Sequence, residues 1–250
     1  MRIFAIGNSY SSDGLVWLYK ILEDLGEKDI FIRNMYISGC SLDRHAANVR
    51  GNLTDYRQDD NADGTWAPTP EQSLLSAIGG MEWDYVSLQQ QSGASGLSET
   101  YGELDFMVSF VKKHANENAK LVWQMTWAYP AHNNTPDFAP YGYDHLKMYQ
   151  SIVETAKQQI VPRDVFTKIV PSGTAIENLY SRFGERLYRD HLHLSYDFGR
   201  YVAALTWAKT LTGKSLKNVR FAPEGVTDEE KKWAIEAAEA AVLSPFAPTL

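Results

Sequence analysis

Two kinds of apolar pattern alternate along this chain, and their alternation restricts the fold more than any other feature of the sequence. Short β-rich runs are followed by longer stretches, such as Gly14–Leu25, in which apolar residues recur every three or four positions. Runs of the first kind are typical of strands, and stretches of the second kind are typical of helices. Strands that alternate with helices form parallel βαβ units. The sequence therefore predicts an α/β protein, a three-layer α/β/α sandwich around a doubly wound parallel sheet.

The individual elements follow from the same patterns. The predicted strands are Ile3–Ile6, Asp29–Ile37, Tyr85–Leu88, Lys120–Thr126 and Val165–Val170. The predicted helices are Gly14–Leu25, Glu71–Ile78, Tyr101–His114, Tyr143–Ile160, Ala175–Arg182, Tyr196–Leu211 and Asp228–Val242. Two further stretches, Leu53–Pro70 and Trp127–Tyr143, are rich in Asp, Asn, Pro, Gly and aromatic residues, and we expect them to be long irregular loops.

Length and charge narrow the class of protein. A chain of 250 residues can bury a core without disulfide bonds, and no repeat or biased linker divides it, so we expect one domain over residues 1–250. The net charge of -7 has the wrong sign for binding nucleic acid or an anionic membrane surface. No stretch approaches the roughly 18 apolar residues of a membrane span. A neutral or cationic partner fits this charge better, and we expect no nucleic acid and no membrane partner.

The single cysteine, Cys40, excludes an intrachain disulfide and any zinc or iron–sulfur site that needs several cysteines. The chain opens with Met1–Ile6 and reaches Gly7 at once, which leaves no room for the apolar segment of a signal peptide. As written, the sequence predicts a cytoplasmic protein. Removal of a native signal peptide would leave the same sequence, and in that case we expect a periplasmic or secreted protein.

Polar turns follow three of the predicted strands, at the edge of the sheet where open α/β proteins bind their ligands. These turns are Gly7–Ser12, Ser38–Ser41 and Gln89–Gly93. Ser9 stands on a tight glycine-led turn before a helix, where its hydroxyl is presented to the crevice and backbone N–H groups face developing negative charge. Ser9 is thus placed as a nucleophile. The alternative is that Ser9 or Ser12 only caps the helix.

Near the far end of the chain, Asp190 and His193 stand three positions apart in a turn before a predicted helix. A serine nucleophile needs a neutral imidazole as its base and a carboxylate on the other ring nitrogen, and a D-x-x-H turn supplies both from one loop. The alternative is a metal site that His191 forms with His193 and Asp190, which one H-x-H pair and one carboxylate support only weakly. We therefore expect no metal and no cofactor.

The polar blocks, in this order, resemble those of the SGNH or GDSL-type hydrolases. The resemblance rests on Ile6–Tyr10 as the nucleophile block, Ser38–Ser41 as the oxyanion-glycine block, Trp83–Ser92 as the third block and Asp190–His193 as the acid and base. It implies a flavodoxin-like sheet with these blocks at its strand ends.

The resemblance also implies roles for individual residues. Ser9 would be the nucleophile, His193 the general base and Asp190 the group that orients the base. The backbone N–H groups of Ser9 and Gly39 would donate to the oxyanion that forms when an ester carbonyl is attacked.

Two departures from the family pattern affect the site. Asn8 replaces the aspartate that is common before the serine, which removes a charge but keeps a side chain able to cap a helix. The third block lacks the usual G-x-N-D, so the side-chain oxyanion donor would have to be a glutamine amide. Gln89 and Gln91 lie on one face of an extended segment and Gln91 is nearer the crevice, so we favour Gln91. The alternative is that these glutamines, with Gln90, only pair backbone groups at the strand end.

Aromatic residues follow the fourth predicted strand at the same end of the sheet. Trp127 and Tyr129, together with Gln89, are predicted to contact substrate, because aromatic rings beside polar groups suit sugar rings or flat acyl groups. The alternative is that the rings pack the loops against the core. Cys40 is expected to be a small buried side chain rather than a second nucleophile. Asp59–Gly64 begins like a calcium loop but lacks its glutamate, so we expect plain turn chemistry at Asn61–Gly64.

The sequence thus predicts a serine esterase that works through an acyl-serine intermediate, and O-deacetylation of a carbohydrate is the most specific version of this hypothesis. The expected partner is therefore a small-molecule or glycan ester. Among enzymes, the alternative is a hydrolase of lipids, thioesters or small esters. Outside enzymes, the alternative is a glycan-binding relative that has lost turnover.

Overall fold

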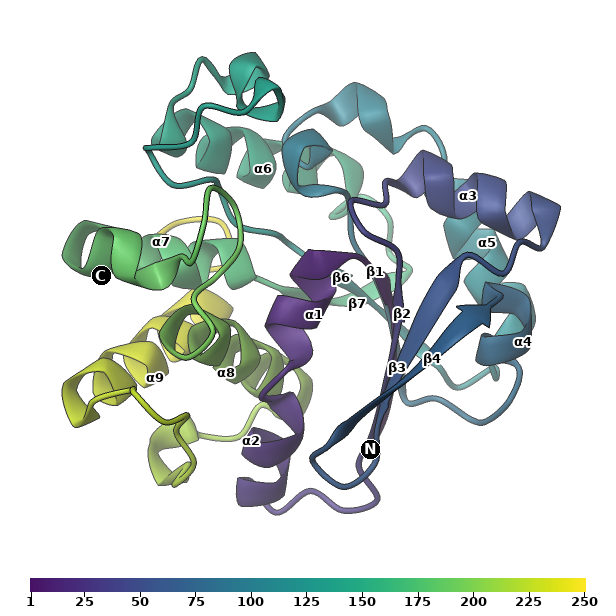
Figure 1. The fold of residues 1–250 in the computed structure, drawn as a ribbon, viewed down its shortest axis with the longest axis horizontal. Coiled ribbons are helices and arrows are strands. Elements are labelled where there is room, and N and C mark those ends of the chain that lie inside the picture. The colour runs from purple at the N-terminus through teal and green to yellow at the C-terminus, as the bar shows by residue number, and fades with distance from the viewer.

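A sheet of seven strands runs through the centre of the molecule (Figure 1), and the computed structural model describes all of residues 1–250. The strands lie in the order β4-β3-β2-β1-β5-β6-β7. Their bounds are β1 Arg2–Gly7, β2 Phe31–Tyr36, β3 Tyr56–Asn61, β4 Trp66–Gln72, β5 Tyr85–Leu88, β6 Lys120–Gln124 and β7 Phe166–Val170. Strands β2, β1, β5, β6 and β7 pair in parallel.

The parallel part of the sheet has a flavodoxin-like strand order. When only its strands are counted along the chain, their order across the sheet is 2-1-3-4-5. The predicted doubly wound α/β sandwich is therefore confirmed. The order reverses between β1 and β5, and ligands of such sheets bind beyond the carboxyl ends of the strands at this point.

Helices cover both faces of the sheet (Figure 1). One layer contains α1 Ser9–Leu15, α2 Leu18–Asp24, α7 Ser172–Phe183, α8 Phe198–Thr212 and α9 Asp228–Leu243, and α8 packs against the other four. The other layer contains α3 Leu42–Gly51, α4 Leu74–Ile78, α5 Leu104–His114 and α6 His145–Gln159. Short 3₁₀ segments are η1 Ser92–Ala94, η2 Ser98–Tyr101, η3 Pro136–Tyr141, η4 Gly184–Leu187 and η5 Leu216–Asn218.

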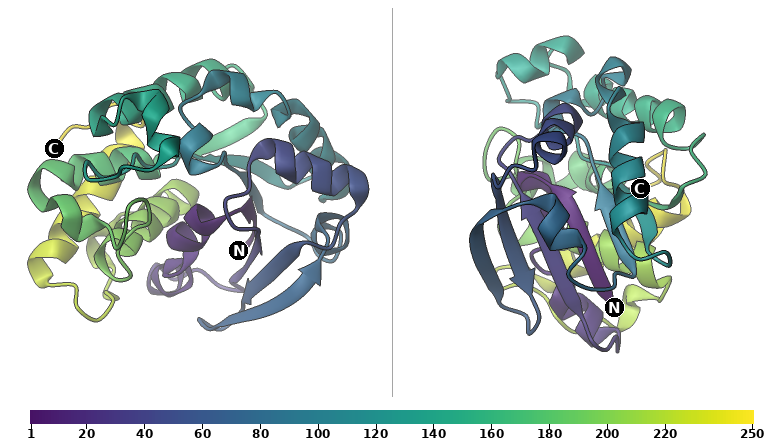
Figure 2. Two further views of the ribbon diagram at one scale, coloured as in Figure 1. Left: turned by 45° about the horizontal axis from the view of Figure 1, so that its top comes forward. Right: turned by 90° about the vertical axis from the view of Figure 1, so that its right-hand side faces the viewer.

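The stretch Leu53–Pro70, predicted to be an irregular loop, contains most of an antiparallel hairpin, β3–β4, at one edge of the sheet (Figure 2). The prediction was wrong because β3 reads Tyr-Arg-Gln-Asp-Asp-Asn and lacks the apolar alternation of an ordinary strand. Polar pairs hold it instead, and Asp60 accepts two hydrogen bonds of 2.7 Å from Arg33 of β2. The side chain of Asn61 accepts from the N–H of Gly64 at 2.8 Å, so Asn61–Gly64 makes the expected turn, while Asp59 and Asp60 belong to β3.

Three helices differ from their predictions. The predicted helix Glu71–Ile78 begins only at Leu74, because Glu71 and Gln72 belong to β4. Helix α3 was not predicted, because His45 and Asn48 lie on its buried face and weaken the apolar periodicity. The predicted helix Gly14–Leu25 is divided into α1 and α2. The stretch Trp127–Tyr143 contains no α-helix or strand and only one 3₁₀ segment, η3, which agrees with the prediction of an irregular loop.

One continuous cluster of 66 buried apolar residues fills the space between the sheet and both helical layers. No helix is both long enough and apolar enough to cross a lipid bilayer.

Candidate active site

Ser9 lies at the start of α1, directly after β1, on the edge of the sheet where the strand order reverses. The residue that caps α1 is Asn8, whose side-chain oxygen accepts from the N–H of Tyr10 at 2.9 Å. The amide nitrogen of Asn8 donates to the carbonyl of Cys40 at 3.0 Å. Because Asn8 caps the helix, the hydroxyl of Ser9 is free to bond elsewhere.

The structure brings Ser9, His193 and Asp190 together in one chain of hydrogen bonds. The Oγ atom of Ser9 lies 2.8 Å from Nε2 of His193, and Nδ1 of the same ring lies 2.9 Å from Oδ2 of Asp190. An ionised carboxylate only accepts hydrogen bonds, so Nδ1 carries the ring proton and Nε2 accepts from the serine hydroxyl. This is the tautomer in which a histidine acts as a general base toward serine.

Backbone groups hold Asp190 in its orientation. Its Oδ1 atom accepts from the N–H of Leu192 at 2.9 Å and from the N–H of His193 at 2.8 Å. Partial burial raises the pKa of this carboxyl, but the two N–H groups and the imidazole of His193 outweigh that effect, so the pKa of Asp190 lies below its usual value. Asp190 is therefore ionised at neutral pH and stabilises positive charge on the ring.

A buried carboxylate connects the two segments that supply these groups. Asp13, four residues after Ser9 on α1, has no exposed surface. It accepts hydrogen bonds from Arg189 at 3.0 Å, from Nε of Arg200 at 2.7 Å and from the N–H of Leu194 at 3.0 Å. Sequence reasoning missed this anchor. The available signal was the spacing of four between Ser9 and Asp13, which places both side chains on one side of the helix.

Trp127 and Tyr129, which we expected to contact substrate, are buried, with exposed fractions of 0% and 1%. Trp127 stacks on Tyr10 with ring centroids 4.1 Å apart, and both side chains donate to the carbonyl of Leu192. The hydroxyl of Tyr129 bonds to that of Ser92 at 2.8 Å. The prediction is wrong for both rings, because burial leaves them no face for a substrate. Their polar atoms support the surrounding loops instead.

Gly39 occupies the turn after β2, and the bond between Asn8 and the carbonyl of Cys40 holds this turn beside Ser9. Its φ of +59° lies in the left-handed region that favours glycine. The N–H of Cys40 donates to the carbonyl of Ile37 and closes the turn, whereas the N–H of Gly39 donates to no other group. Gly39 is exposed, so its N–H and the first N–H of α1 are available to a substrate oxygen.

The three glutamines after β5 have different surroundings. Gln89 is 2% exposed and donates to Oδ1 of Asn8 at 2.8 Å, so the prediction that it contacts substrate is wrong. Gln90 is also buried, and its Oε1 atom accepts from the N–H of Gln91 at 2.8 Å. Gln91 is partly exposed, and its Oε1 atom accepts from the N–H of Ala94 at 2.9 Å. Its amide nitrogen has only two long contacts of 3.4 Å, so its role as an oxyanion donor stays a prediction.

Two further side chains from the sequence analysis have definite places. The ring of His191 lies beside that of His132, with centroids 5.2 Å apart, and no group of three His, Cys, Asp or Glu side chains is placed to hold a metal ion. Cys40 is buried, as expected, and burial raises the pKa of its thiol to about 12. A thiol with this pKa stays protonated at neutral pH and is a poor nucleophile.

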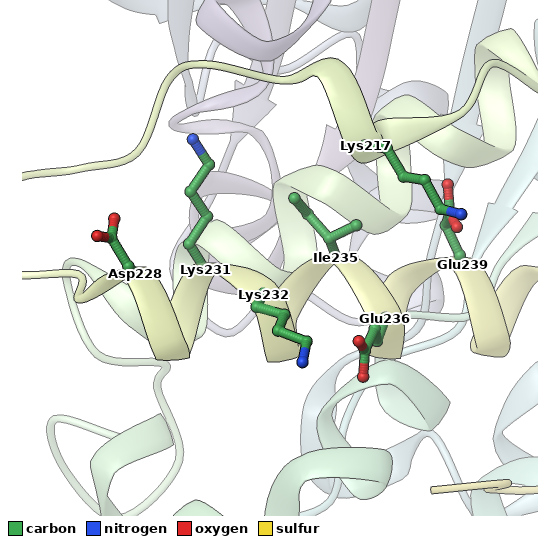
Figure 3. A pocket seen from close by; sticks show the side chains of 7 residues that line it. All are labelled: Lys217, Asp228, Lys231, Lys232, Ile235, Glu236 and Glu239. Carbon is green, nitrogen blue, oxygen red and sulfur yellow. The ribbon is translucent and has the colours of Figure 1, made fainter.

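Two cavities bear on where a ligand binds. A shallow hollow of about 310 Å³ lies between α9 and η5, lined by three lysines, three acidic residues and Ile235 (Figure 3). Its Lys231 and Lys232 point away from each other, and none of the Ser9 site lines it. A smaller cavity of about 100 Å³ lies beside α1. Its lining residues are Ser12, Val16, Asn34, Trp66 and Arg200.

The strand order and the hydrogen-bonded serine, histidine and aspartate at its switch point define an α/β protein with an SGNH-like fold. Residues 2–241 match DUF4886, a domain of unknown function, and the chain belongs to this family. A crystal structure of a DUF4886 family protein from Bacteroides uniformis ATCC 8492 is similar over 100% of this chain and 97% of that chain, with 36% sequence identity and a TM-score of 0.95.

More distant structures share the fold alone. A candidate SGNH hydrolase from Slackia heliotrinireducens has 21% identity and a TM-score of 0.54, over 84% of this chain and 98% of that chain. A catalytic mutant of an acetylxylan esterase from Geobacillus stearothermophilus has 12% identity and a TM-score of 0.51, over 88% of this chain and 94% of that chain. No curated protein matches the chain in sequence.

Proposed function

We propose that this chain is a serine esterase that works through an acyl-serine intermediate and removes acetyl groups from a carbohydrate. The observation that carries the proposal is the hydrogen-bonded chain from Asp190 through His193 to Ser9, with distances of 2.9 and 2.8 Å. Both distances are within the range that proton transfer between a nucleophile and its base requires.

In the first half of the reaction, Oγ of Ser9 attacks the ester carbonyl carbon while its proton passes to Nε2 of His193. The carbonyl oxygen becomes an oxyanion and accepts from the N–H groups of Ser9 and Gly39, with the amide of Gln91 as a third donor. The bond to the sugar oxygen then breaks, and His193 gives its proton to that oxygen. The sugar leaves as an alcohol, and the acetyl group stays on Ser9.

In the second half, His193 takes a proton from a water molecule, which attacks the acetyl carbon. Breakdown of the second oxyanion returns the proton from His193 to Oγ of Ser9 and releases acetate. Asp190 stays ionised throughout, because its pKa is below the usual value, and it stabilises the imidazolium that forms in each half.

Two observations support a bulky, polar substrate over a lipid. The edge of the sheet is open, since Ser38 and Gly39 are exposed and the side chain of Asp190 is 42% exposed. The cavity beside α1 is small and has polar residues in its lining, whereas a long acyl chain needs a deep apolar pocket. The description of one distant structure as an acetylxylan esterase agrees with this choice.

The test is a set of kinetic constants for p-nitrophenyl acetate, butyrate and octanoate. Replacing Ser9 with alanine (Ser9→Ala) should lower kcat by about 10⁴, because only binding and the oxyanion donors remain. The matched control is Ser109→Ala, which removes an exposed hydroxyl on α5 and should change kcat by less than about twofold. Activity that survives in Ser9→Ala contradicts the proposed nucleophile. Faster turnover of the octanoate ester than of the acetate ester contradicts the acetyl preference and favours a lipid hydrolase.

A further inference from the structure

We infer that the cavity beside α1 binds the alcohol part of the ester, a neutral sugar, and places its acetylated oxygen at Ser9. This inference rests on the proposed function, because it names where the substrate of the same site lies. The cavity replaces the buried rings of Trp127 and Tyr129 as the expected sugar contact.

The position of the cavity on α1 is the first argument. Ser12 and Val16 line it and stand three and seven residues after Ser9, so the three side chains share one stripe of the helix. A helix rises 1.5 Å per residue, so Ser12 lies roughly 4.5 Å along the axis from Ser9. Val16, to whose carbonyl Trp66 donates, lies roughly 10.5 Å from Ser9 on the same measure, so the near end of the cavity is within one helical turn of the nucleophile and its far end is about two turns away.

The polar groups that line the cavity are held in place, and Arg200 keeps N–H groups that have no hydrogen-bond partner. Nε and Nη2 of Arg200 are both held by Asp13 at 2.7 Å, and its Nη1 has no hydrogen-bond partner. The amide nitrogen of Asn34, which is 1% exposed, donates to Ser12 at 3.0 Å and fixes the Ser12 hydroxyl at the cavity wall. Preorganised donors of this kind suit the hydroxyl oxygens of a sugar.

The charge around the cavity favours a neutral ligand. Two arginines, Arg189 and Arg200, are matched by two carboxylates, Asp13 and Asp190, with separations from 2.7 to 3.8 Å. The cluster thus has no net charge to attract an anion. An apolar acyl chain is disfavoured for another reason, since it would cover the free Nη1 donor of Arg200 without pairing it.

Aromatic rings lie at this cavity and next to it. The indole of Trp66 lines the cavity and is held in place because its Nε1 atom donates to the carbonyl of Val16 at 3.2 Å. Tyr196 is 63% exposed, and its ring centroid lies 4.7 Å from the guanidinium carbon of Arg200. Aromatic faces beside polar donors recognise sugar rings.

The size of the cavity defines what enters it. A volume of about 100 Å³ is small beside the roughly 300–1,000 Å³ of pockets that enclose a whole ligand. It therefore holds one or two substituents of a sugar ring, and the ring itself lies across the mouth against Trp66.

The same face of the sheet continues from the cavity toward Gly39. Asn34 and Tyr36 alternate on β2, and their cross-strand partners on β3 are Asp59 and Arg57. The Arg57 guanidinium lies 4.2 Å from the centroid of the Tyr36 ring and is hydrogen-bonded to Asp59 at 2.7 Å. Asn34 and Asp59 are buried, so Tyr36 and Arg57 are the part of this strip that offers a second sugar unit an aromatic and polar surface next to the oxyanion donor.

The test compares an acetylated oligosaccharide with p-nitrophenyl acetate, which carries the same acyl group and no sugar. The measured quantity is the specificity ratio, kcat/KM for the oligosaccharide divided by kcat/KM for p-nitrophenyl acetate. Trp66→Ala should lower this ratio roughly tenfold through a higher KM for the oligosaccharide, because it removes one aromatic contact. Trp66→Phe keeps a ring and should restore most of the ratio. Val16→Phe fills the cavity and should lower the ratio even where Trp66→Ala fails to fold.

The matched control is Trp233→Ala, which removes another partly exposed tryptophan, on α9, and should leave the ratio within twofold. The inference is overturned if Trp66→Ala and Val16→Phe leave the ratio within twofold, or if the wild-type protein hydrolyses p-nitrophenyl acetate and no acetylated oligosaccharide. The second of these results leaves the esterase function standing.

Failure of the esterase function gives a different result, since the wild-type protein would then hydrolyse neither substrate. In that case calorimetry with the deacetylated oligosaccharide decides. Binding that Trp66→Ala weakens about tenfold supports the sugar site, and no binding overturns it.

Discussion

The carboxylate of Asp13 offers the sharpest test of how the site is held together, because it joins the helix of Ser9 to the loop of His193. Asp13→Asn keeps the size of the side chain and removes its charge. Arg189 and Arg200 then lose the carboxylate to which they donate, although the side chains of both are only 17% exposed. Removing one partner of a buried ion pair costs about 3–5 kcal/mol, and the partial exposure of the arginines favours the lower end of that range.

This loss should appear in both stability and turnover. A loss of about 3 kcal/mol lowers the melting temperature by roughly 6–12 °C in a chain of this size. The loop that Asp13 anchors also loosens, and a shift of about 1 Å at a reacting group costs roughly 10²-fold in rate. We therefore expect kcat for p-nitrophenyl acetate to fall about 10²-fold while KM changes less than about threefold.

The assay needs a control that loses an ion pair elsewhere. Asp60→Asn removes the partner of Arg33 on the hairpin, where the two side chains are 24% and 12% exposed and lie 2.7 Å apart. It should lower the melting temperature and leave kcat within about twofold. The reasoning is refuted if Asp13→Asn melts lower but keeps kcat within threefold of the wild-type value, because the network would then stabilise the fold without positioning His193.

Three other perturbations have definite expected outcomes. The pKa of Asp190 is lower in the folded protein than in the unfolded chain, so the stability that Asp190 contributes is present above the unfolded-state pKa and is lost as the pH falls through the folded-state pKa. The difference in melting temperature between the wild type and Asp190→Asn, measured from pH 2 to 7, should therefore shrink at the acid end. A difference that stays constant contradicts this. The thiol of Cys40, with a pKa of about 12, should resist iodoacetamide at pH 8 until the protein is unfolded, and fast labelling of the native protein contradicts its burial. Gln91→Ala should lower kcat roughly 10²- to 10³-fold with little change in KM, whereas retention of more than about a third of kcat limits Gln91 to capping η1.

The sequence predicts the parallel part of the fold well, because the central strands β1, β5 and β6 are largely buried on both faces and read as apolar runs, as Ile3–Ile6 does. The hairpin β3–β4 was not predicted because β3 consists largely of polar residues and is held by polar contacts. Asp60 pairs with Arg33 of the adjacent strand, and such a contact between distant residues leaves no periodic signal in the sequence.

The candidate site divides in a similar way. Ser9, Asp190 and His193 stand at strand ends and turns, where a polar residue without a packing role is conspicuous, and the structure places all three within hydrogen-bonding distance in a chain. The aromatic residues carried no such signal. The sequence around Trp127 is equally rich in aromatic residues whether its ring faces substrate or is buried. In the structure the ring stacks on Tyr10 inside the protein. Periodicity cannot separate these cases in an irregular stretch.

Labelling with a fluorophosphonate, followed by peptide mass spectrometry, tests the central claim most directly, because the probe forms a covalent bond only with an activated serine. We expect Ser9 to be labelled in the wild-type protein, no labelling in Ser9→Ala, and labelling slowed at least about 10²-fold in His193→Ala, which lacks the base. Labelling of Ser11, Ser12 or Ser92 in place of Ser9, or no labelling of the folded wild-type protein, would contradict the claim that Ser9 is the nucleophile of an esterase.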